Sequence, residues 1–376
     1  MKRFQDHVRV AAMMLAGALG MSTAVRADTP EPVAAVASIN APVSVFATGL
    51  NNPRGLKFGP DRHLYVAEGG TGGQYSTVGQ CTQVPTVGPY TGSPTGSRIS
   101  RINAHGYRET VADNIPSSQT IASQGSLTSG VADIAFVDGT LYGVLAGAGC
   151  SHGVPSLPNG VIRVGKHGHW ELIANLSAFY MANPTKVIEP DDFEPDGTPY
   201  SMIAVDDELY VVEPNHGELD RVTTGGRIGR VADISASQGH IVPTAMAFHD
   251  GAFYVGNLNR FPIVDGSSKI LKITRGGHVE VFATGFTTVL GVALDERGRL
   301  YVLENTTGNP FPTLGTGRVI RVNRSGTREV IASQLVLPTA MTFGPDGNLY
   351  VSVYGFGFPP QDLGQILKIE MPRDLN

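Results

Sequence analysis

The chain is poor in charge and cysteine and has one tryptophan, and these shortages exclude several classes of protein. Charged residues make up 16% of the 376, and 28 Lys and Arg against 33 Asp and Glu leave a net charge of −5. This balance supplies no basic face for a phosphate backbone, so we expect no nucleic-acid partner. No segment shows a sustained helical period, which excludes a coiled coil. The 47 Gly and 25 Pro indicate many turns, but too few for a disordered chain.

Long hydrophobic runs are also scarce, and the one present lies at the N-terminus. A basic start, an uncharged run over residues 10–25 and small residues just before Asp28 are typical of a secretory signal. The run is short for a bilayer span, although a retained membrane anchor is the alternative. We expect residues 1–27 to be removed as a signal peptide, residues 28–40 to be a disordered linker, and the mature protein to be secreted or periplasmic, without a membrane segment.

Cys81 and Cys150 are the only cysteines. They are too few for a zinc site and form no CxxC redox pair. An exported protein meets an oxidising compartment, which favours a disulfide between them. Two free, buried thiols are the alternative.

A hydrophobic–Tyr–hydrophobic triplet recurs six times, and its spacing is typical of propeller blades. Successive tyrosines are 77, 68, 44, 47 and 49 residues apart, which suits four-stranded blades with insertions. Each unit contains short alternating segments bounded by Gly, Asp and Asn turns, as β-strands do. The triplets centre on Tyr65, Tyr142, Tyr210, Tyr254, Tyr301 and Tyr350.

The last unit lacks a fourth strand, and an unassigned one precedes the first unit. Pairing VSVFAT at 43–48 with the segment 365–370 would close the ring and remove exposed sheet edges. We therefore predict an all-β, six-bladed propeller over residues 41–376, with four-stranded blades and closure by the N-terminal strand 43–48 joining the last blade. We expect it to be a monomer.

The connections differ in length between the two faces of such a propeller. Tight turns form one face, the tight-turn face, and every insertion falls on the other, the long-loop face. Long loops on a rigid scaffold commonly carry binding, so we expect a small molecule or a protein to bind the long-loop face. The insertions are 69–96, 113–130, 146–159, 175–199, 305–316 and 355–364.

Strand ends on the long-loop face supply the candidate ligand-binding residues, whereas no catalytic set is evident. Several carboxylates around a channel mouth could hold a divalent cation such as Ca²⁺, which prefers oxygen ligands. The alternative is that these acids accept hydrogen bonds from neighbouring loop amides. The candidates are Arg54, Glu68, Tyr200, Glu213, Asn257 and Glu304.

Other motifs on this face are weaker. The segment 192–197 begins like a calcium loop, but Ile203 stands at its twelfth position instead of a glutamate. His152, His216 and His240 lie in loops, where each is a candidate general base or an ordinary surface side chain.

The stretch VFATGLNNPRGLKFGPDRHLYVAEGGTGG at 45–73 resembles the opening of the ScyD/ScyE family, secreted propellers related to the NHL and SMP-30 groups. The likeness covers essentially the whole mature chain and implies an exported propeller. It implies no particular reaction, because most members have no established activity. SMP-30 lactonases hold a divalent cation with Glu, Asn and Asp, which implies Glu68, Asn257 and Glu304 as the matching positions here. This chain departs by having Asn257 where an acid is expected.

Three functions are consistent with these observations. We favour a non-catalytic scaffold that binds a ligand or protein on its long-loop face, because no catalytic set converges. The alternative is a metal-dependent hydrolase of lactonase or esterase type at the central channel. A second alternative is a dehydrogenase for sugars that uses pyrroloquinoline quinone; such enzymes share six blades, but the missing basic cluster argues against it.

Overall fold

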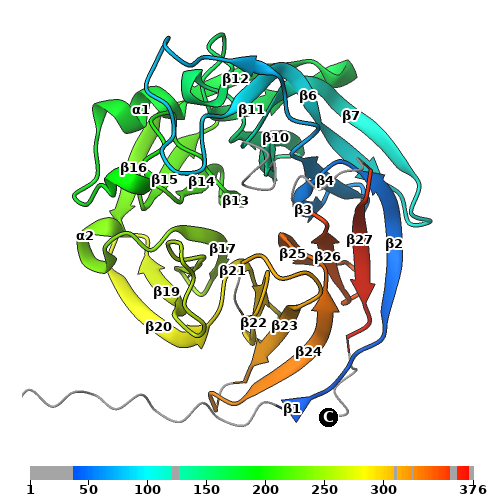
Figure 1. Cartoon of the computed structure of the whole chain (residues 1–376). Helices are drawn as coiled ribbons and strands as arrows, with labels where there is room; N and C mark the ends of the chain where they lie inside the picture. Colours follow the sequence, from blue (N-terminus) through cyan, green and yellow to red (C-terminus); the bar gives the residue numbers. More distant parts are fainter. Residues whose placement is uncertain (1–36, 121–126, 309–310, 324, 356–361, 372–376) are drawn as a thin grey trace, which may run out of the picture. The chain divides into compact units, whose positions relative to one another are not determined.

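The computed structural model describes residues 37–120, 127–308, 311–323, 325–355 and 362–371. The expected signal peptide and most of the expected linker lie outside these residues. In the unit Ala34–Asn376, six β-sheets surround a central axis (Figure 1), and the first strands of neighbouring sheets contact one another at that axis. This confirms the predicted six-bladed propeller with four-stranded antiparallel blades. None of the helices in the described ranges is long and apolar enough to cross a bilayer.

Each blade uses four strands, counted here from the axis outward. Blade 1 contains β3 (Pro53–Phe58), β4 (Leu64–Glu68), β6 (Thr91–Ile102) and β7 (Arg108–Gln119). Blade 2 contains β9 (Val131–Val137), β10 (Thr140–Leu145), β11 (Gly160–Val164) and β12 (Trp170–Asn175). Blade 3 contains β13 (Ser201–Val205), β14 (Glu208–Glu213), β15 (Glu218–Thr223) and β16 (Ile228–Asp233). Blade 4 contains β17 (Pro243–His249), β18 (Ala252–Asn257), β19 (Ser268–Thr274) and β20 (Val279–Phe286). Blade 5 contains β21 (Val289–Leu294), β22 (Leu300–Glu304), β23 (Gly317–Val322) and β24 (Arg328–Leu335). Blade 6 contains β25 (Ala340–Phe343), β26 (Leu349–Val353), β27 (Gly364–Ile369) and β2 (Val43–Leu50).

The outer strand of blade 6 comes from the N-terminal part of the described chain. β2 pairs antiparallel with β27, with Val43 opposite Ile369, which is the pairing expected from the sequence. A further strand, β1 (Ala37–Ser38), pairs parallel with β24. This short strand lies inside the segment that we expected to be a disordered linker.

The repeated tyrosine lies on the second strand of every blade, and in blades 1, 5 and 6 it contacts both its own tight turn and the next blade. Tyr65 and Tyr350 each donate a hydrogen bond of 3.0 Å to a turn carboxylate, Asp61 and Asp346. The rings also pack edge-to-face on phenylalanines of the following blade, with centroids 5.0 to 5.1 Å apart: Tyr65 on Phe136, Tyr350 on Phe58 and Tyr301 on Phe343. Such pairs stabilise by about 1 kcal/mol beyond their buried area.

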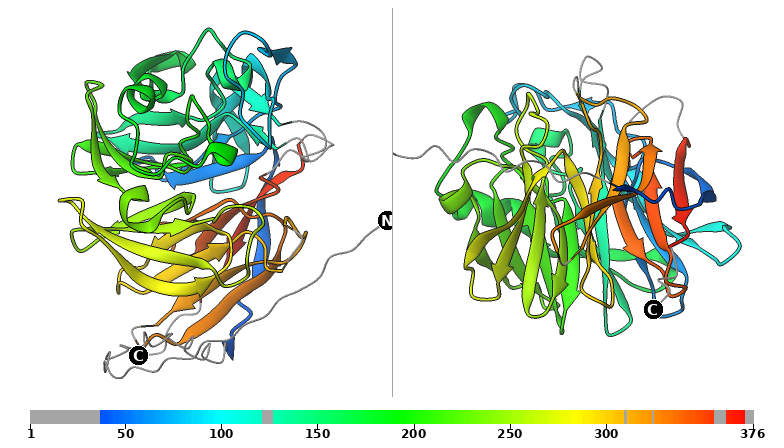
Figure 2. Two further views of the ribbon diagram at one scale, coloured as in Figure 1. Left: turned by 60° about the vertical axis from the view of Figure 1, so that its left-hand side comes forward. Right: turned by 90° about the horizontal axis from the view of Figure 1, so that it is seen from below.

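Parts of the expected long loops are regular structure. β6 and β7 are each 12 residues long and extend into the insertions 69–96 and 113–130. Two short strands flank them, β5 (Tyr75–Ser76) and β8 (Thr128–Ser129). The insertion 175–199 contains helix α1 (Leu176–Ala182), and a second short helix, α2 (Ser235–Gln238), follows blade 3. Figure 2 shows the long connections gathered at one end of the blades and the tight turns at the other.

The apolar core lies between neighbouring blades, in six clusters that each combine residues of two adjacent sheets. At the axis, by contrast, the first strands approach so closely that a side chain is excluded at some positions. A Cβ on Gly55 would lie 1.9 Å from Oδ1 and 2.7 Å from Cα of Asp133. Gly55 therefore permits blades 1 and 2 to meet at the axis.

We predict that Gly55→Ala lowers the free energy of unfolding by about 2 kcal/mol or more, because the clash involves backbone and forces the two inner strands apart. The matched control is Gly229→Ala in β16, where an added Cβ would meet nothing within 4 Å. Urea unfolding followed by circular dichroism measures both variants. Equal unfolding midpoints for the two would contradict the close approach at the axis.

Candidate functional site

The acids predicted to ring the channel mouth tie the connections that enter the first strands to the blades. Each ends the second strand of its blade and accepts a hydrogen bond from a backbone amide that lies two or three residues before the first strand of the same blade. These bonds are Asn51 N to Glu68 Oε2 at 2.6 Å, Thr198 N to Glu213 Oε1 at 2.8 Å and Thr287 N to Glu304 Oε1 at 2.7 Å. All three carboxylates are fully buried. These bonds match the alternative that the sequence left open, in which the acids accept hydrogen bonds from neighbouring loop amides.

Two of these carboxylates also pair with an arginine that stands opposite them on the third strand. Arg98 donates to Glu68 at 2.8 Å, and Arg318 donates to Glu304. Burial raises the pKa of Glu304 although Arg318 opposes this shift. Asn257 has the corresponding place in blade 4, where its Oδ1 accepts from the amide of Lys269 at 2.7 Å.

A divalent cation is not favoured at Glu68, Asn257 and Glu304. Each uses its oxygens within its own blade, and two of them already face an arginine. Across the described ranges, no three His, Cys, Asp or Glu side chains form a group that could hold a metal ion. The metal assignment therefore stays an untested prediction, and we derive no chemistry through it.

Arg54 and Tyr200 are the two candidates that reach the axis. The Tyr200 hydroxyl donates to the carbonyl of Thr339 at 2.8 Å, and because blades 3 and 6 face each other across the ring, this bond spans the channel. Arg54 of blade 1 hydrogen-bonds Tyr200 and donates to the carbonyl of Thr128. Burial raises the pKa of Tyr200 to about 12, so the hydroxyl stays protonated as a donor.

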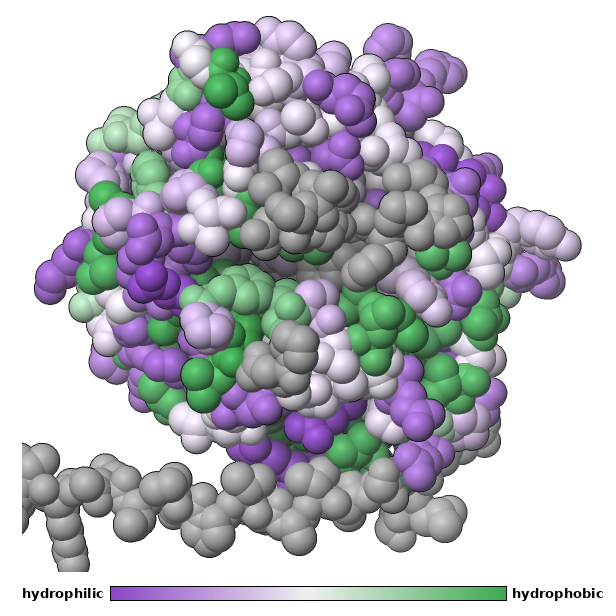
Figure 3. Space-filling view, in the orientation of Figure 1, coloured by the Kyte–Doolittle hydropathy of each residue, from purple (hydrophilic) through white to green (hydrophobic). Residues whose placement is uncertain are grey.

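An apolar cap adjoins this polar crossing on the long-loop side. Leu290 and Leu337 are buried, and side chains from several connections pack against them; these are Leu127, Tyr200, Leu258, Phe311 and Val336. Figure 3 views the long-loop face, on which apolar and polar residues are mixed around the middle. Tyr200 belongs to both groups, so the cap and the crossing together obstruct the channel at this end.

The three loop histidines converge on one stretch, residues 189–197, which we call the acidic segment. The contacts are His152 Nε2 to Glu194 Oε2 at 3.0 Å, His240 Nε2 to Asp192 Oδ2 at 2.7 Å and His216 Nε2 to the Glu194 carbonyl at 3.0 Å. They come from connections on blades 2 and 3 that the sequence could not relate to one another. The histidines therefore bind this segment to its neighbours.

His152 is enclosed and has both ring nitrogens engaged. Its Nδ1 lies 2.8 Å from the Ala148 carbonyl, Nε2 faces Glu194, and the ring of Tyr90 packs 4.6 Å away. Burial alone would lower the pKa of His152, but the hydrogen bond and charge of Glu194 raise it overall. The pair is a buried hydrogen-bonded contact between two loops, and a fully buried ring gives no access for general-base catalysis.

Further contacts secure the same loops. Ser151 donates from its amide and its hydroxyl to Asp196, at 2.8 and 2.6 Å, and Arg260 pairs with Glu189 at 2.7 Å. A disulfide joins Cys81 and Cys150, which confirms that the two cysteines pair between neighbouring blades. The long-loop face is thus joined by covalent, ionic and hydrogen bonds.

The sequence analysis did not identify one buried pair of acids, Glu218 and Asp220. In blade 3, Glu218 takes the place opposite the strand-end acid Glu213 that arginine occupies in blades 1 and 5. Burial raises the pKa of Glu218 to about 7, and burial together with Glu218 raises the pKa of Asp220 well above its ordinary value. Within the described chain, neither Asp220 oxygen nor the nearby Tyr180 hydroxyl has a hydrogen-bond partner. The i, i+2 spacing of two acids on one strand was the available signal.

We predict that replacing Cys81 and Cys150 by serine lowers the free energy of unfolding by up to about 4 kcal/mol, because the disulfide closes a loop of 69 residues. Urea unfolding of the double variant gives the value, with the reduced wild type as a check. Unchanged stability in both would show that the disulfide does not restrain these loops.

We predict that stability falls as the pH rises from 5 to 8. The folded pKa values of Glu218 and Asp220 lie above their unfolded values, so the stabilisation is complete below about pH 4 and is lost as pH rises through the folded values. Asp220→Asn removes one of these charges and should stabilise by about 1 to 3 kcal/mol at pH 8 while flattening the dependence. The control is Asp138→Asn in an exposed turn, and urea unfolding across this pH range measures both. A slope unaltered by Asp220→Asn would refute the assignment.

Comparison with known proteins supports the fold and goes no further. No family model and no curated protein matches the chain. A gluconolactonase from Xanthomonas campestris is 12% identical (88% of this chain, 90% of that chain, TM-score 0.53), and the calcium-binding protein regucalcin from Agrobacterium tumefaciens is 13% identical (90% and 96%, TM-score 0.53). A Thermus thermophilus protein named as a glucose dehydrogenase-type oxidoreductase is 18% identical (88% and 100%, TM-score 0.53). These likenesses support the propeller fold, and membership of the ScyD/ScyE family stays a prediction.

Proposed function

We propose that this protein is an exported, non-catalytic propeller whose long-loop face binds a protein partner. The observation that carries the proposal is an exposed apolar patch on loops that are tied to one another. Export itself rests on the N-terminal sequence and on the disulfide, which is typical of oxidising compartments.

The patch consists of large apolar side chains from three adjacent connections. Ile188 is 46% exposed, Phe261 45%, Val264 64% and Leu314 58%. The connections touch one another: Arg260 pairs with Glu189 at 2.7 Å, and the Phe261 ring lies 4.8 Å from that of Phe311. Exposed apolar groups gathered on one surface are typical of protein-interaction sites.

The loops that carry or border this patch need little ordering on binding. The three histidine contacts hold the acidic segment, and the disulfide fixes the loop that carries His152. Glu189 of the acidic segment reaches the patch through Arg260. Loops that are already fixed lose less conformational entropy when a partner binds, which favours affinity. The strand-end carboxylates are occupied separately, by loop amides and in two blades also by an arginine, an arrangement that supports binding better than hydrolysis.

The hydrolase and dehydrogenase alternatives rest on fold likeness. The described residues offer neither a three-residue metal group nor a convergent catalytic set to favour them. The hydrolase is therefore included in the experiment as an outcome.

We predict that charge on the patch abolishes partner binding. The double variant Phe261→Asp/Leu314→Glu is compared with Val45→Glu/Val281→Glu, which changes equally exposed apolar residues (57% and 47%) on the outer strands β2 and β20. Affinity capture from the extracytoplasmic fraction of the source cells should recover a partner with the wild type and the outer-strand variant, but at least about tenfold less with the patch variant.

Two results would overturn the proposal. The first is equal capture by both double variants. The second is turnover of gluconolactone or aryl esters by the wild type with added Ca²⁺ that falls in Glu304→Gln, because this would favour the hydrolase.

A further inference from the structure

The central channel is a blind pit that opens on the tight-turn face. Near the crossing of Tyr200 it narrows to a cavity of about 30 Å³, lined in part by Gly55, Asp133 and Ser201, which has room for about one water. Toward the tight turns it widens into a funnel of about 670 Å³, lined by the ends of all six first strands. Lys57, Met246, Val292 and Met341 line both parts, so the two are continuous. The funnel has the volume of a small-molecule site.

Four half-buried phenylalanines form a collar around the funnel, one from the end of the first strand in each of blades 1, 2, 4 and 6. They are Phe58, Phe136, Phe248 and Phe343. Three of them pack edge-to-face against the repeated tyrosines of the preceding blades. The ring centroid of the fourth, Phe248, lies 4.9 Å from the ring centroid of Phe253 and 4.9 Å from the guanidinium carbon of Arg275. The collar is therefore a prearranged aromatic surface.

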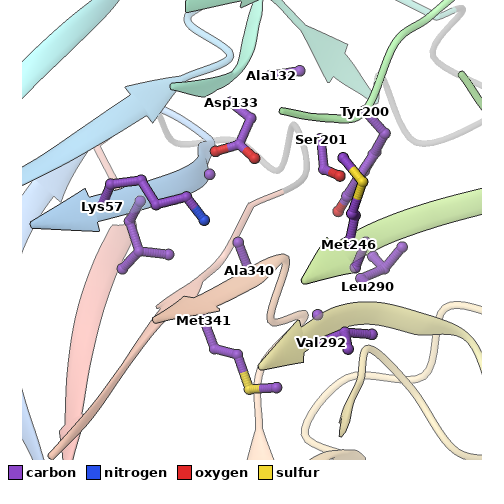
Figure 4. Close-up of a pocket in the computed structure, with 14 residues that line it drawn as sticks. Lys57, Ala132, Asp133, Tyr200, Ser201, Met246, Leu290, Val292, Ala340 and Met341 are labelled. Carbon is purple, nitrogen blue, oxygen red and sulfur yellow. The ribbon is translucent and has the colours of Figure 1, made fainter. Parts of the chain in front are cut away.

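Lys57 places an ammonium group at the base of the funnel. Figure 4 shows Lys57 and Asp133 directed toward the middle of the pocket from neighbouring blades. Among the described residues, the side chain of Lys57 makes no hydrogen bond or salt bridge, and its electrostatic neighbour is Asp133. Both Asp133 oxygens accept backbone amides, from Ile134 at 2.8 Å and Met202 at 2.9 Å. Asp133 is thus committed to the backbone, and burial raises its pKa toward the neutral form.

The charges at the rim are paired, in contrast to Lys57. Asp206 pairs with Arg275 at 2.8 Å, and His249 lies 3.2 Å from Asp250. Lys57 is therefore the cation of the pit that remains for a ligand.

We propose that this pit binds an organic anion with a flat apolar body, whose carboxylate contacts Lys57 while its rings lie within the phenylalanine collar. The proposal concerns the face opposite the apolar patch and does not depend on the proposed protein partner. An ammonium at the base of an aromatic funnel selects the charge of the ligand, and the collar selects its shape.

The experiment compares two probes of nearly the same shape, the anion 2-naphthoate and the neutral 2-naphthamide, by isothermal titration calorimetry with the folded mature chain. We expect 1:1 binding of naphthoate, weakened at least about tenfold by Lys57→Met, and weaker binding of the amide that Lys57→Met leaves unchanged. Phe136→Leu should weaken both probes. Lys166→Met, in an exposed turn between β11 and β12 on the same face, is the matched control and should change neither.

Thermal unfolding establishes that each variant is folded before titration. Equal affinity for naphthoate and naphthamide, or naphthoate binding that survives Lys57→Met, would overturn the proposal. A loss in Lys166→Met as large as that in Lys57→Met would overturn it also, because the effect would then reflect the charge of the whole face. Absence of naphthoate binding to the wild type would do the same.

Discussion

The long-loop face depends on one repeated interaction, in which a carboxylate at the end of the second strand accepts the amide of the loop entering the first. Glu68, Glu213 and Glu304 all make this bond in fully buried positions. A buried carboxylate without such donors would be costly, whereas a hydrogen bond to a charged group contributes about 1.5 to 3 kcal/mol. Each bond fixes where its loop enters the ring, so the positions of Arg54 and Tyr200 follow from it.

The carboxylate at the end of the second strand has a different electrostatic environment in different blades, because the residue opposite it on the third strand differs. Arginine stands there in blades 1 and 5, so the buried charge is compensated. Glutamate stands there in blade 3, and Arg230 on the fourth strand pairs with this Glu218. One arginine then faces several acids, including Asp220, and protonation is the remaining way to relieve their repulsion. A blade repeat thereby contains a group that titrates near neutral pH.

The two ends of the channel have different characters because residues from distant blades meet at the axis. Tyr200 and Thr339 are 139 residues apart, yet their hydrogen bond crosses the ring and obstructs one end. At the other end the tight turns are too short to cover the opening, so the pit and its phenylalanine collar remain accessible. The face with the long loops is thus the more closed one, and the face with the short turns carries the axial hollow.

The sequence left the state of Cys81 and Cys150 open between a disulfide and free thiols, but by itself it determined the class of fold, the number of blades and the pairing of residues 43–48 with the last blade. These follow from local period, turn residues and repeat spacing, which are properties of short segments. It also indicated which residues stand at strand ends, but not what they contact. The tertiary structure alone decided that Glu68 and Glu304 hold loop amides, that three histidines meet residues 189–197 and that Lys57 lies at the base of a pit. Those contacts join segments from different blades or connections, and their geometry exists only once the ring brings six sheets around one axis.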